Sequence, residues 1–495
     1  MKKYRCLRCG AAIKKDEEKK GSVRCGVCGS VGLVNERGFV VPLYESEDFE
    51  PDDVTVLGHK YTVEKHPSNY KIDGSVLVSF KKRFGGDAFV PDGVTEIADG
   101  AFFGAKIDRA VLPSGLTKIG ARAFENSAVS EVVAAGKITE IGEGAFRGCK
   151  NLLSLAFKTG LKVIGKEAFA RSGLITVCLP GTLTHLGEGA FRGCTGLIHT
   201  GLRGVGSIGK GAYEGCTAIA EAVLPVGVEV VSESAFKGCT SLVKAVLPEG
   251  TREVGGGAFF GCEKLAEVVL PESLVMLGTD GDDGGVFEGC KRLHEINLGE
   301  NIRSVGRFAF RNCLSLAHVN SSRLSGKLSD GAFEGCESLR EMDMPVGVTE
   351  VGERAFFGSG LKRVSFGKKI AVLGKEAFGE TLLDTVVVPD NVAVLGEGLF
   401  KRCRCLRSAS VKSAAKELPP RMFEGCTALT ELALEKGVTS LGDGFIADCS
   451  ALGALKLPAA LKDVGDGAAY GCERLPLPVK AKLRSITPKA CDRKE

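Results

Sequence analysis

The sequence predicts a β-rich solenoid with minor helical content, preceded by a small metal-binding segment. Three observations lead to this expectation. One pattern recurs through most of the 495 residues, each copy contains an alternating apolar run that ends at a proline, and four cysteines stand in two close pairs near the N-terminus. Self-similarity at a short fixed period is typical of a repeat architecture, so the length does not point to several globular domains.

Residues 257–271, GAFFGCEKLAEVVLP, represent the repeat. An aromatic residue, usually Phe after Ala, returns about seventeen times at steps of about 22 or 23 residues, which is the range of leucine-rich repeats. The Leu-x-x-Val-x-Leu-Pro run alternates as a strand does, and the proline ends it because proline has no N–H to donate to a ladder. We therefore expect parallel strands stacked at about 4.8 Å on the concave face of a leucine-rich-repeat solenoid. The recurring positions are Phe102, Phe124, Phe146, Phe169, Phe191, Tyr213, Phe236, Phe259, Phe287, Phe310, Phe333, Phe356, Phe378, Phe400, Phe423, Ile446 and Tyr470.

Composition divides the chain into five segments. Residues 1–34 contain the paired cysteines, and residues 35–68 form an acidic linker with six acids in the run ESEDFEPDD. In residues 69–93, two β-rich runs flank a basic, glycine-containing turn, which predicts a hairpin that caps the N-terminal end of the array. The array spans residues 94–478, and residues 479–495 form a C-terminal cap with a basic tail.

Cys6 and Cys9 form one C-x2-C pair, and Cys25 and Cys28 form another, with fifteen residues between the pairs. Two thiolates on one tight turn can reach the same ion, and two such turns complete a tetrahedral site with no position open for chemistry. The pattern predicts a zinc ribbon with a structural Zn²⁺, since a segment this short needs a metal to fold. A rubredoxin-like iron site or a redox-active cysteine pair is the competing interpretation of the same spacing.

A strand end at Leu-Pro or Met-Pro, a Val-x-x-Ile-Gly run and an Ala-Phe-x-x-Cys turn follow one another through the array. Examples are VLPSGLTKIGARAF in residues 111–124 and MPVGVTEVGERAF in residues 344–356. On these motifs, residues 69 to about 478 resemble the BspA-like, or treponemal, class of leucine-rich repeats. The resemblance implies a leucine-rich-repeat fold and an interaction scaffold of a kind often displayed on microbial surfaces. The chain differs from that pattern by its zinc ribbon and by the lack of a secretion signal at its start.

The overall charge gives no reason to expect nucleic acid or membrane as a partner. Lysine plus arginine number 65 and aspartate plus glutamate number 61, so no global charge attracts a polyanion or a membrane surface. The chain starts MKKYRCLRCG without the apolar stretch of a signal peptide, and no apolar run reaches the ~18 residues of a membrane span. We therefore expect a cytoplasmic protein whose 19 cysteines are reduced or metal-bound.

Two small residues that recur through the array are predicted to serve packing. A glycine ends the Val-x-x-Ile-Gly run in most turns, and Pro419 replaces it once. Since proline holds φ near about −65°, this position should require small size for close stacking rather than a left-handed backbone. A cysteine stands three residues after the aromatic position in eleven turns, from Cys149 to Cys449. We expect buried, protonated thiols bonded to turn carbonyls, and a disulfide or metal column is the alternative.

Residues between the buried positions of each strand should face the concave surface. The last of these is mostly apolar in the N-terminal half of the array and becomes polar at Asn297, Asn320, Asp343 and Ser365. We hypothesise a protein-binding patch on the apolar half. The alternative is that these residues reflect β-propensity alone. The candidate residues are Ile175, Ile198, Val223, Val243, Val246 and Val269.

The sequence thus favours a non-catalytic scaffold with a protein partner. Nine Lys or Arg against three acids in residues 1–34 leave a nucleic-acid- or ribosome-associated factor as the alternative. A surface or adhesin-like protein, as the resemblance implies, is the second alternative. No enzyme is expected, because His294, Glu295 and His318 have no third histidine or implied pocket beside them. The acidic insertion at residues 279–285 is interpreted as a solvent loop, since Gly284 stands where a calcium loop needs a ligand.

Overall fold

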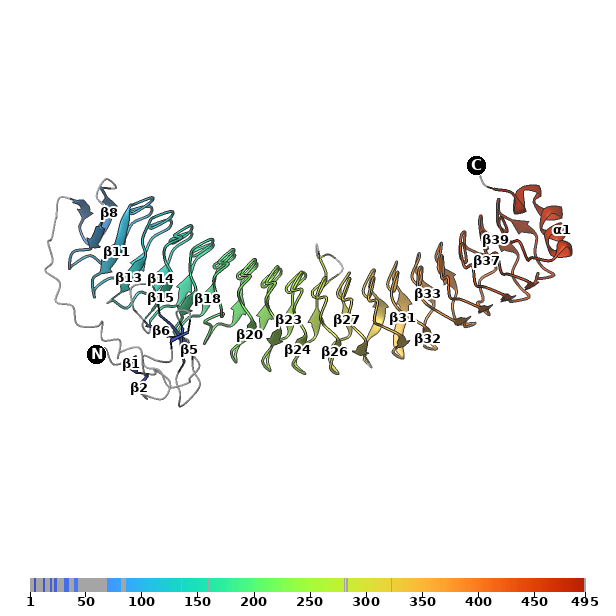
Figure 1. Ribbon diagram of the computed structural model, residues 1–495, viewed down its shortest axis with the longest axis horizontal. Coiled ribbons are helices and arrows are strands. Elements are labelled where there is room, and N and C mark those ends of the chain that lie inside the picture. Colours follow the sequence, from blue (N-terminus) through green and yellow to red (C-terminus); the bar gives the residue numbers. More distant parts are fainter. Residues whose placement is uncertain are drawn as a thin grey trace. The chain divides into compact units, whose positions relative to one another are not determined.

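The structure is a computed structural model that describes six short strands between residues 4 and 42 and then residues 69–493, apart from 82–85, 135, 158–159, 280, 282–283 and 322. By its internal contacts the chain divides into two compact units, Met1–Gly204 and Val205–Glu495. Both contain the turns of a β-solenoid, and Figure 1 shows their regular succession. No helix among the described residues is long and apolar enough to cross a membrane.

The six N-terminal strands form two antiparallel sheets. β1 (Tyr4–Arg5) pairs with β2 (Ala12–Ile13). The second sheet contains β3 (Glu18–Lys19), β4 (Ser22–Arg24), β5 (Val31–Val34) and β6 (Val40–Pro42). β6 falls within the segment predicted as a linker. The predicted zinc ligands Cys6, Cys9, Cys25 and Cys28 lie outside the described residues, as does the acidic run of residues 45–53.

A hairpin stands at the N-terminal end of the array, but not at the expected turn. β7 (Tyr70–Asp73) and β8 (Val76–Phe80) pair antiparallel across Gly74, whose φ of 58° suits a tight turn. β9 (Gly86–Phe89) pairs in parallel with β11 (Ile107–Leu112) instead of joining this hairpin. The expectation that the two β-rich runs pair across the basic turn is therefore wrong, because the two runs enter different ladders.

Each solenoid turn contributes to two parallel ladders. The first ladder contains the predicted Leu-x-x-Val-x-Leu-Pro strands, and the second contains short strands from the Val-x-x-Ile-Gly run. In the first unit, Arg109 aligns with Glu131 in the first ladder, and Glu96 aligns with Lys118 in the second. The second ladder was not predicted, because most of its strands have two residues and show no alternation. The remaining first-ladder strands of this unit are β13 (Glu131–Ala134), β15 (Ser154–Ala156) and β17 (Thr176–Cys178). After β8, its second-ladder strands are β10 (Glu96–Ile97), β12 (Lys118–Ile119), β14 (Glu140–Ile141), β16 (Val163–Ile164) and β18 (His185–Leu186).

The second unit repeats this two-ladder arrangement. Its first-ladder strands are β20 (Glu221–Val223), β22 (Lys244–Val246), β24 (Glu267–Val269), β26 (Glu295–Asn297), β28 (His318–Asn320), β30 (Glu341–Asp343), β32 (Arg363–Ser365), β34 (Thr385–Val388), β36 (Ser408–Val411), β38 (Glu431–Leu434) and β40 (Ala454–Lys456). Its second-ladder strands are β19 (Ser207–Ile208), β21 (Val230–Val231), β23 (Glu253–Val254), β25 (Met276–Leu277), β27 (Ser304–Val305), β29 (Ser325–Leu328), β31 (Gly347–Val351), β33 (Val372–Leu373), β35 (Val394–Leu395), β37 (Glu417–Leu418), β39 (Ser440–Leu441) and β41 (Asp463–Val464).

A helix and a 3-10 segment close the C-terminal end of the second unit. α1 (Leu477–Ile486) follows Pro476, and the 3-10 segment is Pro488–Cys491. Gly467 N donates to Lys489 O at 3.0 Å and Ala469 N donates to Ala490 O at 2.8 Å, so this segment supplies the carbonyls that a further turn would supply. Because the last loop leads into a helix instead of a strand, about sixteen turns are complete.

A column of buried aromatic rings fills the interior of each unit. From Phe102 to Phe191, neighbouring ring centroids are 4.7 to 5.3 Å apart and the rings are nearly parallel. From Tyr213 to Phe423 the separations are 5.2 to 5.8 Å. Such stacking contributes about 0.5–1.5 kcal/mol per pair beyond area burial. The last aromatic position was misplaced by one residue: Ile446 N donates to Ala468 O, so Ala469 occupies the position that was assigned to Tyr470.

The glycine that ends the Val-x-x-Ile-Gly run is required for close stacking of turns, as predicted. A Cβ added to Gly255 would lie 2.6 Å from Glu233 N, and one added to Gly442 would lie 2.4 Å from Pro420 N. Neither has a positive φ. Gly278, next to the acidic insertion, is an exception with φ 71°.

The left-handed backbone occurs at two other positions, which the sequence analysis did not identify. These lie two residues before and two residues after the aromatic position, as at Gly257 (φ 62°) and Gly261 (φ 68°) around Phe259. Non-glycine residues adopt the same conformation elsewhere, for example Arg171 (φ 57°) and Asn312 (φ 59°). Since L-residues avoid this region by roughly 1–2 kcal/mol, the stacked loops impose the conformation on whichever residue is present.

Candidate partner-binding face

Three valines form a continuous exposed row on the first ladder of the second unit. Val223, Val246 and Val269 are the last residues of β20, β22 and β24, and their Cα atoms are in register. Val223 is 55% exposed and Val269 is 43% exposed, whereas Val246 is half-buried. Adjacent parallel strands lie about 4.8 Å apart, so the side chains of this valine row contact one another along the face.

Two further exposed valines lie near the valine row in the sequence: Val243, which was predicted, and Val226, which was not. Val243, directly before β22, is 46% exposed. Val226 is 86% exposed and follows Val223 by three residues. The sequence signal for Val226 was its place after proline, where the next two turns carry Glu249 and Glu272.

Ile175 and Ile198 form a separate pair within the first unit. Both are half-buried, and Ile198 N donates to Ile175 O at 3.1 Å, which places them in consecutive turns. They are therefore less exposed than Val223, Val243 and Val269. The six predicted residues thus fall into two groups, and the more exposed group is in the second unit.

Charged side chains precede the valine row on the same face. Glu221, Lys244 and Glu267 are in register as the first residues of β20, β22 and β24, and we call them the entry row. Lys244 Nζ lies 2.7 Å from Glu267 Oε1. The hydrogen bond to Glu267, with the nearby charge of Glu221, raises the pKa of Lys244, so this lysine is engaged within the row.

Acidic side chains also follow the valine row. Glu249 and Glu272, which we call the exit row, stand three residues after Val246 and Val269. The Glu249 carboxylate accepts hydrogen bonds from Glu272 N at 3.1 Å and Ser273 N at 3.4 Å, so the two turns are joined through backbone amides. In the part of the chain that the structure describes, no basic side chain forms an ion pair with Glu249 or Glu272.

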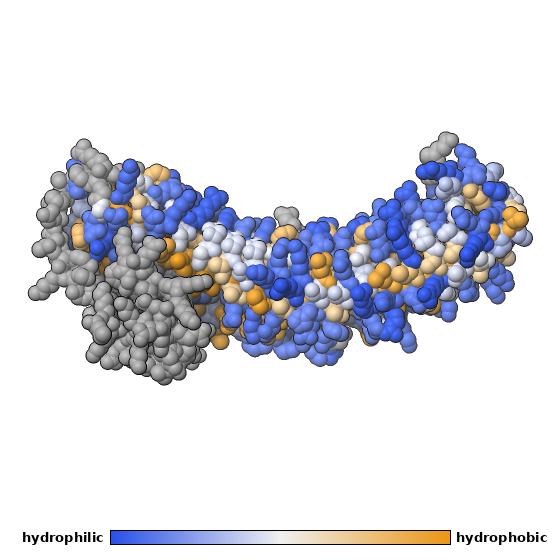
Figure 2. All heavy atoms as spheres, viewed as in Figure 1, coloured by the Kyte–Doolittle hydropathy of each residue, from blue (hydrophilic) through white to orange (hydrophobic). Residues whose placement is uncertain are grey.

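The same position of the ladder is polar in the following turns, as the sequence predicted. Asn297 aligns with Asn320, and Asp343 aligns with Ser365, whose hydroxyl donates to the Asp343 carboxylate. Figure 2 shows hydrophobic and hydrophilic residues interspersed along the visible surface of the array. The valine row therefore ends at β24, and the same ladder position is apolar again at the exposed Val387 of β34.

The cysteine column is a packing feature, as expected. Cys262 Sγ donates to Phe236 O at 3.2 Å, and Cys149 Sγ donates to Phe124 O at 3.0 Å. Burial raises the pKa of Cys262 to about 12 and that of Cys149 to about 11, so both thiols are protonated. The same bond to the carbonyl at the aromatic position of the preceding turn is made by Cys194, Cys239, Cys290, Cys313, Cys336, Cys403, Cys426, Cys449 and Cys472, the last of them to Ile446 O.

Buried hydroxyls occupy the column where a turn lacks cysteine. Ser127 lies 3.4 Å from Cys149, and Thr381 lies 3.2 Å from Cys403. Outside the column, Cys405 is exposed and Cys178 is half-buried. Cys405 lies two residues beyond the column, where the chain has left the interior.

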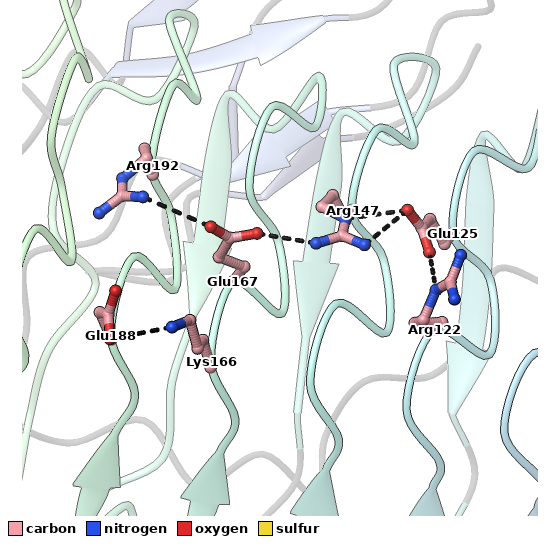
Figure 3. A network of polar contacts seen from close by, with 7 residues as sticks. All are labelled: Arg122, Glu125, Arg147, Lys166, Glu167, Glu188 and Arg192. Atoms are coloured by element: carbon pink, nitrogen blue, oxygen red, sulfur yellow. Dashed lines mark hydrogen bonds and ion pairs between the residues drawn. The ribbon is translucent and has the colours of Figure 1, made fainter.

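A ladder of ion pairs crosses the loops of the first unit (Figure 3). Glu125 contacts both Arg122 and Arg147, and Arg147 Nη1 lies 2.8 Å from Glu167 Oε2. Arg192 Nη1 lies 3.4 Å from the other oxygen of Glu167. Since each charge faces an opposite one in the next turn, this ladder ties turns together and does not form a binding site for an ion.

Glu295 and His318 are the first residues of two neighbouring strands. Glu295 and His318 are in register on β26 and β28, but no group of three or more potential metal ligands is found among residues whose side chains the structure describes. The four cysteines predicted to bind zinc lie outside that set. The structure describes the acidic insertion only in part, because residues 280, 282 and 283 lie outside the described residues.

Comparison with known proteins gives one family. The model of the BspA type leucine rich repeat region matches residues 80–198, 202–280, 283–383 and 372–492. A leucine-rich repeat protein from Bacteroides ovatus is 22% identical with a TM-score of 0.45, and the match covers 82% of this chain and 91% of that one. A leucine rich cell surface protein from Faecalibacterium prausnitzii is 18% identical with a TM-score of 0.34, covering 86% and 98%. The pneumococcal vaccine antigen PcpA is 15% identical with a TM-score of 0.31, covering 86% and 96%. A search of curated proteins finds no match.

Proposed function

The chain belongs to the BspA-type leucine-rich repeat family, and on that basis we propose that it is a non-catalytic scaffold that binds a protein partner through its first strand ladder. The contact surface is the valine row, Val223, Val246 and Val269, together with Val243. The single observation that supports this surface is the register of Val223, Val246 and Val269 in three consecutive turns, with Val223 and Val269 exposed and Val246 half-buried between them. Contiguous exposed apolar side chains mark interaction sites more often than isolated ones do.

The inward side of the same strands supports the distinction between structural and binding residues. Ala222 and Ala245, which precede Val223 and Val246, are fully buried. β-propensity and strand alternation account for an exposed valine on a single strand, and the proposal rests on the recurrence of valine at this position in three consecutive turns. A partner that covers the row removes about 25 cal/mol of unfavourable hydration per Å² of apolar surface.

The test is a pull-down from the source organism with the Val223→Lys, Val246→Lys double variant. Loss of a partner that the parent chain retains is the expected result, because two buried ammonium groups disfavour an apolar contact. Val387→Lys is the matched control: Val387 occupies the same ladder position on β34 and is 52% exposed, but lies outside the row. Unchanged recovery of the partner with the double variant would contradict the proposal.

We also propose that Cys6, Cys9, Cys25 and Cys28 hold a structural Zn²⁺. The fit is supported by the strands on either side of each pair: β1 and β2 are antiparallel neighbours before and after Cys6 and Cys9, and β4 and β5 are so for Cys25 and Cys28. In the sequence, each C-x2-C pair therefore falls between two antiparallel strands, which is the place of a zinc knuckle in a zinc ribbon. When bound, the ion would cross-link the two C-x2-C pairs and would leave no coordination position open for chemistry.

A second candidate function is binding of RNA or DNA by the N-terminal segment. It is favoured by one observation, the nine basic against three acidic residues in residues 1–34. A retardation of labelled RNA or DNA by the full chain that weakens steeply with added salt would support it. We further propose that the protein resides in a reducing compartment such as the cytoplasm, because none of the fifteen described cysteines is in a disulfide.

A further inference from the structure

We infer that the partner of the valine row presents a positively charged amphipathic segment, in which apolar side chains are flanked by lysine or arginine. This inference rests on the proposed function, since it specifies the partner of the same face. It follows from the charges that surround the row. The entry row and exit row together contain Glu221, Glu267, Glu249 and Glu272 against a single cation, Lys244.

Geometry places these carboxylates within reach of a bound segment. Glu221 and Val223 are two residues apart on one strand, so their side chains are about 7 Å apart on the same face. Glu249 stands three residues beyond Val246, which is at most about 10 Å of chain. Two other basic residues, Lys264 and Arg292, are not part of either row. They lie in the loops that precede β24 and β26, on the N-terminal side of the buried Leu265 and Leu293.

The acidic charge of the two rows is only partly compensated within the protein. Lys244 is bonded to Glu267, which leaves Glu221 as a second carboxylate beside one ammonium group. The carboxylates of Glu249 and Glu272 accept bonds from backbone amides of the next turn, which hold them in place without cancelling their charge. Acidic rows on both sides of an apolar row complement a segment with basic residues on both sides of its apolar ones.

The charge pattern also disfavours other occupants. An acidic segment would place carboxylates beside Glu221 and Glu272, which repel them. A nucleic acid would bring phosphates to the same surface and would find one lysine there. The proposed occupant is therefore a basic protein segment, and acidic or nucleic-acid occupants are outcomes that the experiment can reveal.

The test uses the full chain and two labelled peptides of eleven residues, one alternating Val with Lys and the other alternating Val with Glu. Fluorescence anisotropy should show the Val/Lys peptide binding at least about tenfold more tightly than the Val/Glu peptide at low salt. The difference should shrink to about twofold at 0.5 M NaCl, where the Debye length is only a few Å. Equal binding of both peptides at low salt, or preference for the acidic peptide or for an oligonucleotide, would overturn the inference.

Variants then separate the charge from the apolar contact. Glu221→Gln with Glu272→Gln removes one acid from each row and should weaken the Val/Lys peptide about three- to tenfold. The Val223→Ser, Val246→Ser double variant should no longer bind the Val/Lys peptide. Retained binding would show that charge attracts the peptide without an apolar contact to the valine row, and this would overturn the inference. Glu417→Gln with Glu431→Gln is the matched control: both residues are exposed strand positions in distant turns of the same unit. An equal loss with this control would also count against the inference.

Failure of this inference differs from failure of the proposed function. One outcome is that the partner recovered in the pull-down is lost with the valine double variant but binds the Glu221→Gln, Glu272→Gln variant with unchanged affinity. That outcome would refute the basic segment and leave the proposed scaffold function intact. A partner that binds both sets of variants as well as it binds the parent chain would refute the face itself. Circular dichroism of every variant, compared with the parent chain, ensures that lost binding does not reflect lost structure.

Discussion

Substitution of Gly255 by alanine should destabilise the second unit by about 2 kcal/mol, through a steric conflict between neighbouring turns. The added Cβ would lie 2.6 Å from Glu233 N and 3.0 Å from Glu233 Cα. Both atoms belong to the backbone of the preceding turn, which is held by ladder hydrogen bonds and cannot rotate away as a side chain would. Overpacking against a fixed neighbour costs about 1–3 kcal/mol.

Two further glycines provide matched controls for the same substitution. Gly238 has φ 71° and only Gly215 backbone atoms at 3.9 Å from an added Cβ, so alanine there meets strain without a clash and should cost about 1 kcal/mol. Gly437 has neither a positive φ nor any atom within 4 Å. Alanine at Gly437 should stabilise by about 0.4–1 kcal/mol, because it restricts the unfolded chain.

Urea unfolding followed by far-ultraviolet circular dichroism would measure the three variants beside the parent chain. Repeat arrays unfold by units rather than in one step, so the order of the midpoints is the decisive quantity. The midpoint should fall most for Gly255→Ala, fall less for Gly238→Ala, and rise for Gly437→Ala. If Gly255→Ala were as stable as Gly437→Ala, the proposed close stacking of turns would be refuted.

Three other predictions concern charge, thiols and metal. Burial alone would raise the pKa of Glu125, but hydrogen bonds from two arginines lower this pKa below the usual 4.5. The ionised carboxylate therefore stabilises the fold above pH 4.5, and this stabilisation is lost as the pH falls through the lower folded-state pKa. Glu125→Gln should therefore flatten the acid decline of the thermal midpoint, and an unchanged slope would contradict this. Exposed Cys405 should react with a thiol reagent in the native protein, and Cys262 should react only after unfolding. If a Cys405→Ser variant keeps the fastest phase of the thiol reaction, the assignment of that phase to Cys405 is disproved. Metal analysis should give about one zinc per chain, which Cys25→Ser with Cys28→Ser should remove; bound iron would refute the zinc assignment.

The sequence specified the parts of the fold that depend on recurrence. The period, the first strand ladder, the buried thiols and the stacking glycine were predicted, since each is repeated in many turns and local variation averages out. The bond from Cys262 Sγ to the Phe236 carbonyl is an example, because the recurrence of cysteine three residues after the aromatic position predicted thiols bonded to turn carbonyls. The exposure of Val223 and Val269 was also predictable from strand alternation.

The remaining features depend on contacts between turns that no single turn displays. The second ladder has mostly two-residue strands, such as β23, which become strands only because the neighbouring turns supply partners. The left-handed residues, such as Arg171, carry no local signal, because stacking imposes their conformation. The N-terminal hairpin was misplaced because β8 and β9 both belong to β-rich runs of the sequence but join different ladders. The extent of the candidate face likewise needed the structure, which revealed Val226.

The separation of structural and exposed positions decides how the binding experiments can be interpreted. The ladder hydrogen bonds, the aromatic stack and the thiol bonds all involve backbone groups or inward side chains such as Ala222 and Phe236. The side chains of Val223 and Val269 take no part in these contacts; only their backbone groups belong to the ladder, where Val269 O accepts from Leu247 N. Surface side-chain substitutions away from such features usually change stability by less than about 0.5 kcal/mol. A partner lost on substitution of these valines is therefore lost because its contact surface has changed, while the solenoid that presents the surface is retained.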